Sequence, residues 1–368
     1  MIKVFGSNVG DEELKQVEES MRNQWLGGGP KLKTFEEKFK KKIGTNNYLM
    51  IDNASNGLFL SLRLLNLPEG SEVILPSFTW IACANAIKMC NCVPIFCDVD
   101  LATQNVTAAL IEPLITNKTR AIVVVHYAGL PVDLDHILEF NIPVIEDAAH
   151  AVDSFYKNRH CGTIGDFGVF SYDSMKNIAV GEGGGFTCKN HDLCFRAERM
   201  RLSGMGTTAY QQAGDNPVRW WEQEVSDIFI KMIPSDIAAG IAIAQLDKLD
   251  KLQKIRKRIW EAYKRELVNV GDLQLPVEAD ISAGNRHSYF TFLIRTKKRD
   301  QLAAHLYENG VYTTLRFFPI HLMKLYQTGH SLTNTEKLKE TALNIPLHPA
   351  ITDFEMDKII TEIKKFFN

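Results

Sequence analysis

A lysine and an aspartate that each follow an apolar run are the side chains best placed for chemistry. Lys176 lies between "FGVFSY" and the glycine cluster "GEGGG", and Asp147 ends the run "IPVIED", 29 residues earlier. If both runs are parallel strands, their carboxyl ends meet at the ligand crevice of the sheet. A solvated surface lysine and a strand-end or helix-cap aspartate would explain each residue alone. Together they predict a pocket in which an amine meets a carboxylate.

Pyridoxal phosphate is a cofactor whose chemistry needs both groups. Its aldehyde forms a Schiff base with a lysine, and a carboxylate keeps its ring nitrogen protonated, so that the ring accepts electrons. Its phosphate needs an anion site. Ala54 and Ser55 open a predicted helix in "DNASNGLFLSL", where N–H groups and the helix dipole favour an anion, although a plain helix cap fits as well. Trp80 follows another strand and could stack on the ring or pack in the core.

The elements that must position these residues alternate along the first two thirds of the chain. Short apolar runs between amphipathic segments are typical of buried strands in a mainly parallel sheet. The expected helices span 12–24, 33–42, 57–65 and 81–89, and the expected strands span 72–76, 92–99, 120–126, 142–147, 167–172 and 184–188.

The last third of the sequence predicts a second, smaller domain. One long helix over 237–267 is expected to lead into a strand at 288–296, a helix near 299–309 and a last helix at 353–367. The fold class is therefore α/β. We expect a large domain over 1–245, with the sheet flanked by helices, and a smaller α+β domain over 246–368.

The composition and net charge of the chain limit the classes of protein to which it can belong. The 368 residues are 45% hydrophobic and 23% charged, and the net charge of −2 gives no general attraction to nucleic acid or to an anionic membrane. No apolar run approaches the roughly 20 residues that span a bilayer, and "MIKVFGSNVGDEELKQ" lacks the apolar core of a secretory signal. Seven scattered cysteines include a C-x-C but no C-x-x-C pair. We expect a cytoplasmic protein with reduced thiols and no metal.

Several longer stretches carry a resemblance. They are "SEVILPSFTWIACANAI", "VPIFCDVD", "AIVVVHYAGLPVDLD", "VIEDAAHA", "GTIGDFGVFSYDSMKNI", "GEGGGF" and "IPLHPAITDFEMDKI". From about residue 20 to its end, the chain resembles the DegT/DnrJ/EryC1/StrS family of sugar aminotransferases. The resemblance implies a fold-type-I pyridoxal-phosphate enzyme.

The same resemblance implies a role for each matched residue. Lys176 would form the Schiff base, Asp147 would bind the pyridine nitrogen, and His150 would lie beside the phenolic oxygen of the ring. Trp80 matches the stacking aromatic. The phosphate positions match Ala54, Ser55 and Ser171, although the family usually has Gly-Thr or Ala-Thr at the first two.

One stretch departs from the family pattern. Before "SDIAA" the family has an asparagine, within Tyr-Asn-Tyr-Arg-Met, that reaches the phosphate of the neighbouring subunit. Here the stretch is "IKMIPSDIAA", and counting back from Ser235 places Lys231 at that position. A lysine suits a phosphate as a point charge, and an ordinary surface lysine fits equally well. The resemblance implies a homodimer with shared active sites.

The segment 310–326, "GVYTTLRFFPIHLMKLY", resembles the branch that acts at C4 of dTDP-4-keto-6-deoxyglucose. Arg316 and His321 are its candidates to face the sugar or its diphosphate, although an arginine could instead hold the domain interface. By family habit L-glutamate is the amino donor and a keto-sugar nucleotide the acceptor, on the way to O-antigen or a related glycan. A C3 sugar-nucleotide or cyclitol aminotransferase is an alternative. Lys176 argues against a family dehydratase, which has histidine there, and with Asp147 against a non-catalytic sensor.

Overall fold

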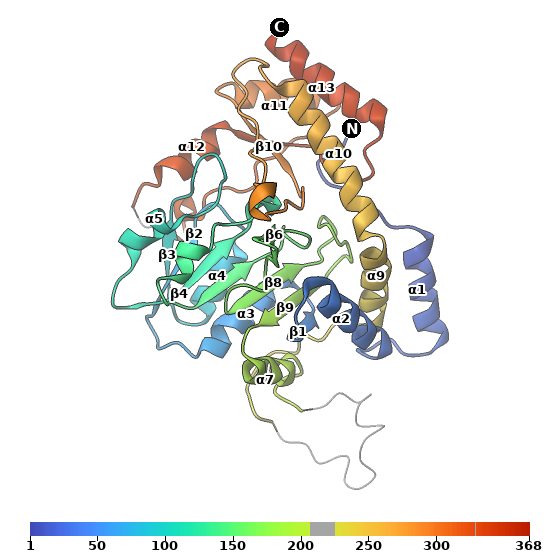
Figure 1. The fold of residues 1–368 in the computed structure, drawn as a ribbon, viewed down its shortest axis with the longest axis vertical. Helices are drawn as coiled ribbons and strands as arrows, with labels where there is room; N and C mark the ends of the chain where they lie inside the picture. Colours follow the sequence, from blue (N-terminus) through green and yellow to red (C-terminus); the bar gives the residue numbers. More distant parts are fainter. Residues whose placement is uncertain (207–224, 328) are drawn as a thin grey trace.

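A seven-stranded sheet lies at the centre of the computed structural model, which describes residues 1–206, 225–327 and 329–368 (Figure 1). Every pair of neighbouring strands is parallel except the two pairs made by β9. From edge to edge the order is β1 (Tyr48–Ile51), β9 (Gly184–Cys188), β8 (Phe167–Ser171), β5 (Val144–Asp147), β4 (Thr119–Val125), β2 (Glu72–Pro76) and β3 (Val93–Cys97). The expected α/β class with a mainly parallel sheet is confirmed.

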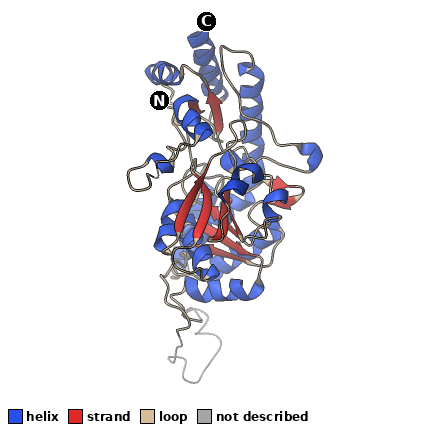
Figure 2. Ribbon diagram, turned by 90° about the vertical axis from the view of Figure 1, so that its left-hand side faces the viewer, coloured by secondary structure: helices blue, strands red, loops and turns tan. Residues whose placement is uncertain are grey.

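Helices cover both faces of the sheet, which explains why most of its strands are apolar throughout (Figure 2). Successive residues on β5 face opposite sides: Val144 joins one buried cluster and Ile145 joins the other. The first cluster includes residues of α2 (Pro30–Ile43) and α9 (Asp236–Asp247). The second includes residues of α3 (Ala54–Leu65), α4 (Ala82–Met89) and α7 (His191–Arg201).

The N-terminal helices are held by a distant part of the chain. Figure 1 shows α1 (Asp11–Arg22) beside α9, and α2 also packs on α9. The buried Asp236, at the start of α9, accepts hydrogen bonds from the N–H groups of Gly29, at 3.0 Å, and Leu32, at 3.1 Å. A carboxylate at a helix N-terminus satisfies N–H groups that have no intrahelical acceptor. Asp236 therefore fixes where α2 begins.

The C-terminal part has a hydrophobic cluster of its own, to which Ile2 contributes. Its antiparallel strands are β10 (Phe292–Arg295) and β11 (Ala342–Ile345). Its helices are α10 (Leu249–Leu267), α11 (Arg299–Glu308), α12 (Thr333–Thr341) and α13 (Asp353–Phe367). The Ile2 N–H donates to the Gly310 carbonyl at 2.7 Å, so the first residues pack against this part. The division into domains 1–245 and 246–368 stays a prediction.

The remaining elements are short. They are α5 (Ala108–Ile111), α6 (Asp135–Leu138), β6 (Phe155–Tyr156), β7 (Arg159–His160), and the 3₁₀ turns η1 (Glu112–Leu114), η2 (Tyr127–Gly129), η3 (Ile281–Ala283) and η4 (Ile320–Leu322). In the parts of the chain that the structure describes, no helix combines the length and apolarity needed to cross a membrane.

The structure differs from the sequence-based expectations at two places. The single helix over 237–267 is two helices, α9 and α10, separated at Lys248, whose φ of −100° and ψ of 1° are not helical. The Lys248 ammonium binds the buried Glu13 carboxylate at 2.7 Å, so packing against α1 fixes this junction. The edge strand β1 was missed, because four apolar residues without alternation resemble a buried piece of helix.

Candidate active site

A cavity of about 670 Å³ lies at the carboxyl ends of the parallel strands. Segments from the sheet, from the starts of two helices and from the C-terminal part contribute to its wall. The structure brings most of the predicted site residues to this wall: Ala54, Ser55, Trp80, His150, Ser171, Lys176 and Arg316.

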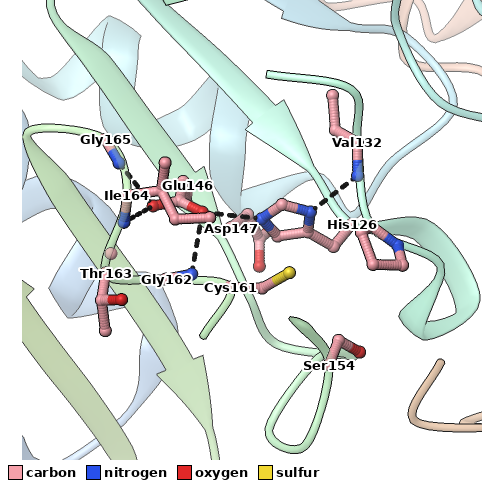
Figure 3. Close-up of polar contacts among 12 residues, drawn as sticks. His126, Val132, Glu146, Asp147, Ser154, Cys161, Gly162, Thr163, Ile164 and Gly165 are labelled. Atoms are coloured by element: carbon pink, nitrogen blue, oxygen red, sulfur yellow. Dashed lines mark hydrogen bonds and ion pairs between the residues drawn. The ribbon is translucent and has the colours of Figure 1, made fainter. Parts of the chain in front are cut away.

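Asp147 lies buried beside this wall, at the end of β5, on the face opposite Glu146 (Figure 3). Its Oδ1 accepts a hydrogen bond from the Ala149 N–H at 3.0 Å, and its Oδ2 accepts one from the Cys83 thiol at 3.3 Å. Burial, and then the charge of Asp147, raise the pKa of Cys83 well above its usual range, so the thiol keeps its proton. The two donors fix the orientation of the carboxylate.

Lys176 is the amine of the cavity. Its Nζ lies 4.8 Å from the centre of the Phe290 ring. Enclosure in the site, and then the positive charge of Arg316, lower the pKa of Lys176 to about 7, and Asp147 and Asp173 only partly oppose this. A lysine with an ordinary pKa is almost wholly protonated at neutral pH, whereas this lowered pKa makes the free amine available there. Such an amine can act as a nucleophile and exchange protons.

The glycine cluster after Lys176 has two structural reasons. Gly181 has a φ of +105°, a conformation that L side chains rarely adopt, and its carbonyl accepts the Ser174 N–H at 3.0 Å. At Gly184 an added Cβ would lie 2.6 Å from the carbonyl carbon of Asn53. The glycine therefore lets β9 approach the start of α3, at the wall of the cavity.

The start of α3 offers an anion site. The Asn53 side chain caps the helix by accepting the Asn56 N–H at 2.9 Å. The other N–H groups of the first turn have no acceptor within the helix, by the geometry of any α-helix. Ala54 and Ser55 carry two of them, Ser55 is exposed, and Ser171 lies across the cavity at the end of β8. N–H groups and hydroxyls converging at a helix N-terminus suit a phosphate.

His150 lies among aromatic rings. It stacks on Phe290 with ring centroids 4.1 Å apart, and Phe317 lies parallel to it at 6.0 Å. Burial, and then the charges of Lys176 and Arg316, hold its pKa well below the usual range, so the ring is neutral. Within the described residues its buried Nδ1 has no hydrogen-bond partner. A buried nitrogen left unpaired in the protein alone is satisfied if a ligand places a polar atom beside it.

Arg316 reaches the cavity from the C-terminal part. Its guanidinium carbon lies 3.7 Å from the centre of the Phe5 ring and 5.1 Å from that of Phe290. Its N–H donates to Asn344 Oδ1 at 3.0 Å, and its carbonyl accepts the Tyr127 hydroxyl. Burial lowers its pKa to about 10, which leaves it charged at neutral pH. Both earlier interpretations thus fit: the backbone joins two parts of the fold, and the side chain lies on the cavity wall.

Three further candidates have distinct surroundings. Trp80 is 56% exposed and lies on the cavity wall, which contradicts a place in the core. His321 is buried outside the cavity wall, where Nδ1 contacts Ser77 Oγ at 2.7 Å and Nε2 lies 3.4 Å from Glu336. Lys231 is exposed and also lies outside this wall. The structure thus places neither His321 nor Lys231 at the cavity of its own chain.

Aromatic residues of this site were missed by reasoning from sequence. Phe290 contacts Lys176, His150 and Arg316, and the Phe5 ring also packs on the guanidinium. Nothing in "SYFTFLIRT" marks one phenylalanine as different from a core residue. Phe317, next to Arg316, is the one that the sequence could have suggested.

These groups fit pyridoxal phosphate. Lys176 offers a free amine, Asp147 a fixed carboxylate, His150 an unpaired buried nitrogen, and the start of α3 an anion site. The fold and the site define a class: a fold-type-I pyridoxal-phosphate enzyme.

Comparison with known proteins gives the family. The model of the DegT/DnrJ/EryC1/StrS aminotransferase family matches residues 7–364, and the chain belongs to this family. A relative in Saccharopolyspora spinosa, dTDP-4-dehydro-2,3,6-trideoxy-D-glucose 4-aminotransferase, is 32% identical over 99% of this chain and 96% of its own. The expected family is confirmed.

Solved structures agree with this assignment. The aminotransferase TlmJ from Streptoalloteichus hindustanus is 37% identical, with a TM-score of 0.93 over 100% of this chain and 98% of its own. Spr1654 from Streptococcus pneumoniae, in its PMP form, is 26% identical, with a TM-score of 0.90 over 100% of this chain and 99% of its own; a PLP form is also known. The protein is therefore an aminotransferase that uses pyridoxal phosphate.

Proposed function

We propose that this aminotransferase moves the amino group of L-glutamate to a keto-sugar nucleotide, at C4 of dTDP-4-keto-6-deoxyglucose. The observation that carries the proposal is the presence of Lys176 and Arg316 in one cavity. The first is an amine that exchanges protons near pH 7, and the second is a guanidinium whose fork suits a diphosphate. The Saccharopolyspora spinosa relative, named for the 4-amination of a related dTDP sugar, supports the choice of substrate.

Different residues of the cavity would bind different parts of the cofactor. Ala54, Ser55 and Ser171 would hold its phosphate, and Asp147, fixed by Cys83 and Ala149, would bind the ring nitrogen. His150 would pair its free Nδ1 with the ring oxygen, and Trp80 would stack on the ring. When bound, pyridoxal phosphate supplies a carbonyl for the amino group and a ring that accepts electrons.

Lys176 would do the work of proton transfer. As a free amine it accepts the proton from the reacting carbon of the amino donor, and as an ammonium it returns that proton at the neighbouring position. A pKa of about 7 keeps both forms populated at neutral pH. The keto acid leaves before the sugar enters, so the two half-reactions predict ping-pong kinetics. The same lysine serves both halves in opposite directions.

The sugar product suits the synthesis of O-antigen or a related glycan, and we place the enzyme in the cytoplasm. We further propose a homodimer with shared active sites. In it Lys231, exposed and away from its own cavity, binds the phosphate in the partner subunit. A symmetric interface would make this contact twice.

The experiment that tests the function is a panel of acceptors with L-glutamate as donor. The panel contains dTDP-4-keto-6-deoxyglucose, C3-keto sugar nucleotides and a keto cyclitol, and mass spectrometry follows the aminated product together with 2-oxoglutarate. We expect the C4-keto nucleotide to react fastest and Lys176→Ala to form no product. Preferred amination of a cyclitol or of C3 would show that the proposed substrate is wrong. Absence of transfer to every acceptor would contradict the proposed function.

A further inference from the structure

A second carboxylate stands directly behind Asp147. Glu146 precedes it on β5 and faces the opposite side of the sheet, where its side chain is 0% exposed (Figure 3). The proposed chemistry gives this residue no role. A wholly buried carboxylate is costly unless hydrogen bonds replace its water.

Four donors surround Glu146. Its Oε1 accepts the N–H groups of Ile164, at 2.6 Å, and Gly165, at 2.7 Å. Its Oε2 accepts the Gly162 N–H at 2.8 Å and lies 2.9 Å from His126 Nε2. Burial opposes ionisation, but these hydrogen bonds outweigh it and the pKa of Glu146 is lowered. The residue is a fixed anion with both oxygens engaged.

The His126 ring is oriented from both sides. Its Nδ1 accepts the Val132 N–H at 3.0 Å, so its proton is on Nε2 and points at Glu146 (Figure 3). Burial disfavours the charged form of the His126 ring, whereas Cys161 and Glu146 favour it. Burial also raises the pKa of Cys161, so this thiol carries no charge at neutral pH. A second ring proton, on Nδ1, would point at the Val132 N–H. The geometry therefore favours the neutral ring.

His126 leads back to Asp147 through the main chain. Its N–H donates to the Asp147 carbonyl at 3.1 Å, directly after the pairing of Val125 with Asp147 in the sheet. The turn 162–165 that binds Glu146 leads into β8, which ends at Ser171. Glu146 therefore joins β5, which carries Asp147, to His126 after β4 and to the approach to β8, whose last residue, Ser171, lies on the cavity wall.

We propose that Glu146 is a positioning residue for Asp147. Its hydrogen bonds to His126 and to the turn 162–165 fix the position and direction of the end of β5, which carries the Asp147 carboxylate. This inference rests on the proposed role of Asp147 as the partner of the ring nitrogen. A catalytic group works only when its supporting contacts hold it within a fraction of an ångström, so the loss of this anchor reduces catalysis without touching the cofactor.

Glu146→Gln is the sharpest substitution, because it keeps the shape and removes two acceptor positions. Whichever way the amide is turned, its NH₂ group faces two donors: Ile164 and Gly165 on one side, or Gly162 and His126 on the other. The strand end must then shift. We expect kcat to fall about 10- to 100-fold. We also expect the cofactor Kd, measured by absorbance titration of the apo-protein, to rise about 10-fold.

A double-mutant cycle separates positioning from general support. If Glu146 acts through Asp147, Glu146→Gln has less than about a two-fold further effect on kcat and on the cofactor Kd in an Asp147→Asn background. A merely structural role would lower kcat, and raise the cofactor Kd, by the same factors in both backgrounds. Glu139→Gln is the matched control, since it disrupts an exposed pair in which His136 lies 3.1 Å away, and we expect it to change neither value.

The other possible outcomes also test the positioning role of Glu146. If Glu146→Gln does not fold, judged by circular dichroism of the apo-protein, Glu146→Asp replaces it, with a shorter carboxylate and the same expected non-additivity. Additive effects, or a Glu146 variant with unchanged kcat and cofactor Kd, would overturn the positioning role while Asp147→Asn still fails. Full turnover in Asp147→Asn itself would instead contradict the proposed function of Asp147.

Discussion

Lys176 and Arg316 face the same aromatic ring. The Lys176 Nζ lies 4.8 Å from the centre of Phe290, and the Arg316 guanidinium carbon lies 5.1 Å from it. Burial, and then the repulsion between these two cations, disfavours the charged form of Lys176, whose proton is more weakly bound than that of Arg316. Arg316 stays charged, whereas the pKa of Lys176 falls to about 7.

The first prediction concerns the pH at which the apo-protein takes up its cofactor. Because only the free amine attacks the cofactor carbonyl, the attachment rate should rise with pH around a midpoint near 7. Arg316→Met removes a nearby positive charge, which raises the pKa of Lys176 and moves the midpoint to higher pH. Stopped-flow absorbance measures the rate. Arg120→Gln, at an exposed arginine, is the control, and an unmoved midpoint in Arg316→Met would contradict this electrostatic origin.

The second prediction identifies the residue that carries the cofactor. Borohydride reduction of the loaded enzyme should leave the adduct on the peptide that contains Lys176, because this amine lies on the cavity wall and is free near neutral pH. Lys176→Ala should lack both the adduct and the absorbance band of the attached cofactor. An adduct on another lysine would rule out the assigned role.

The third prediction is that Asp147→Asn folds but loses turnover by at least about 100-fold. The amide keeps the shape of the side chain, but it no longer holds a proton on the ring nitrogen. Because this contact matters most in the transition state, kcat should fall more than substrate binding weakens. Steady-state kinetics with a thermal unfolding curve check both parts. Near-normal turnover would show that the role given to Asp147 is wrong.

The fourth prediction separates the contribution of His150 to stability from its contribution to binding. Its pKa is lowered below the usual 6.5, so the unfolded chain binds its proton more readily than the folded chain does. The stability of the apo-protein should therefore fall as the pH drops below about 6.5, and His150→Phe should weaken this loss. The same variant should bind the cofactor about 5- to 20-fold less tightly, since one hydrogen bond is lost.

Unfolding midpoints of the apo-protein at pH 5.5 and 7.5, together with a cofactor titration, measure both effects. His136→Phe, at an exposed histidine, is the control. Unchanged cofactor affinity in His150→Phe would show that the free Nδ1 does not bind the ring.

The fifth prediction tests the shared site. Lys231→Ala should retain cofactor poorly while remaining folded, because its exposed side chain supports no core. Mixing inactive Lys176→Ala with Lys231→Ala under subunit exchange, at a cofactor concentration that leaves the latter unloaded, should restore activity. One site of each heterodimer then carries both substitutions and the other carries neither, so about a quarter of the sites work. A stable, active monomer in sedimentation, or confirmed exchange without recovery, would contradict a phosphate contact from the partner.

Local signals explain which elements were predictable. The last helix was expected at 353–367 and is α13, Asp353–Phe367, because Thr352 and Glu355 form a capping box at its start. The strand expected at 142–147 ends at Asp147 as β5 does. By contrast, β1 pairs only with β9, more than 130 residues later, and the break between α9 and α10 depends on the contact of Lys248 with Glu13. A local sequence pattern does not show contacts between residues that lie so far apart along the chain.

The sequence by itself determined the order and types of the reacting groups. Lys176 and Asp147 could be named because each lies at or just after the end of a recognisable strand, and strands of a parallel sheet bring their ends to one edge. The start of α3 could be named because Ala54 and Ser55 open a recognisable helix. Only the tertiary structure decided how these groups behave. Phe290 and Arg316 come from more than 100 residues further along the chain to lie beside Lys176, and Glu146 acquires its partners only when β4 and the turn 162–165 meet around it. A pKa and a fixed orientation depend on what surrounds a side chain in space, because both desolvation and hydrogen bonding are set by neighbours that the chain brings together only on folding.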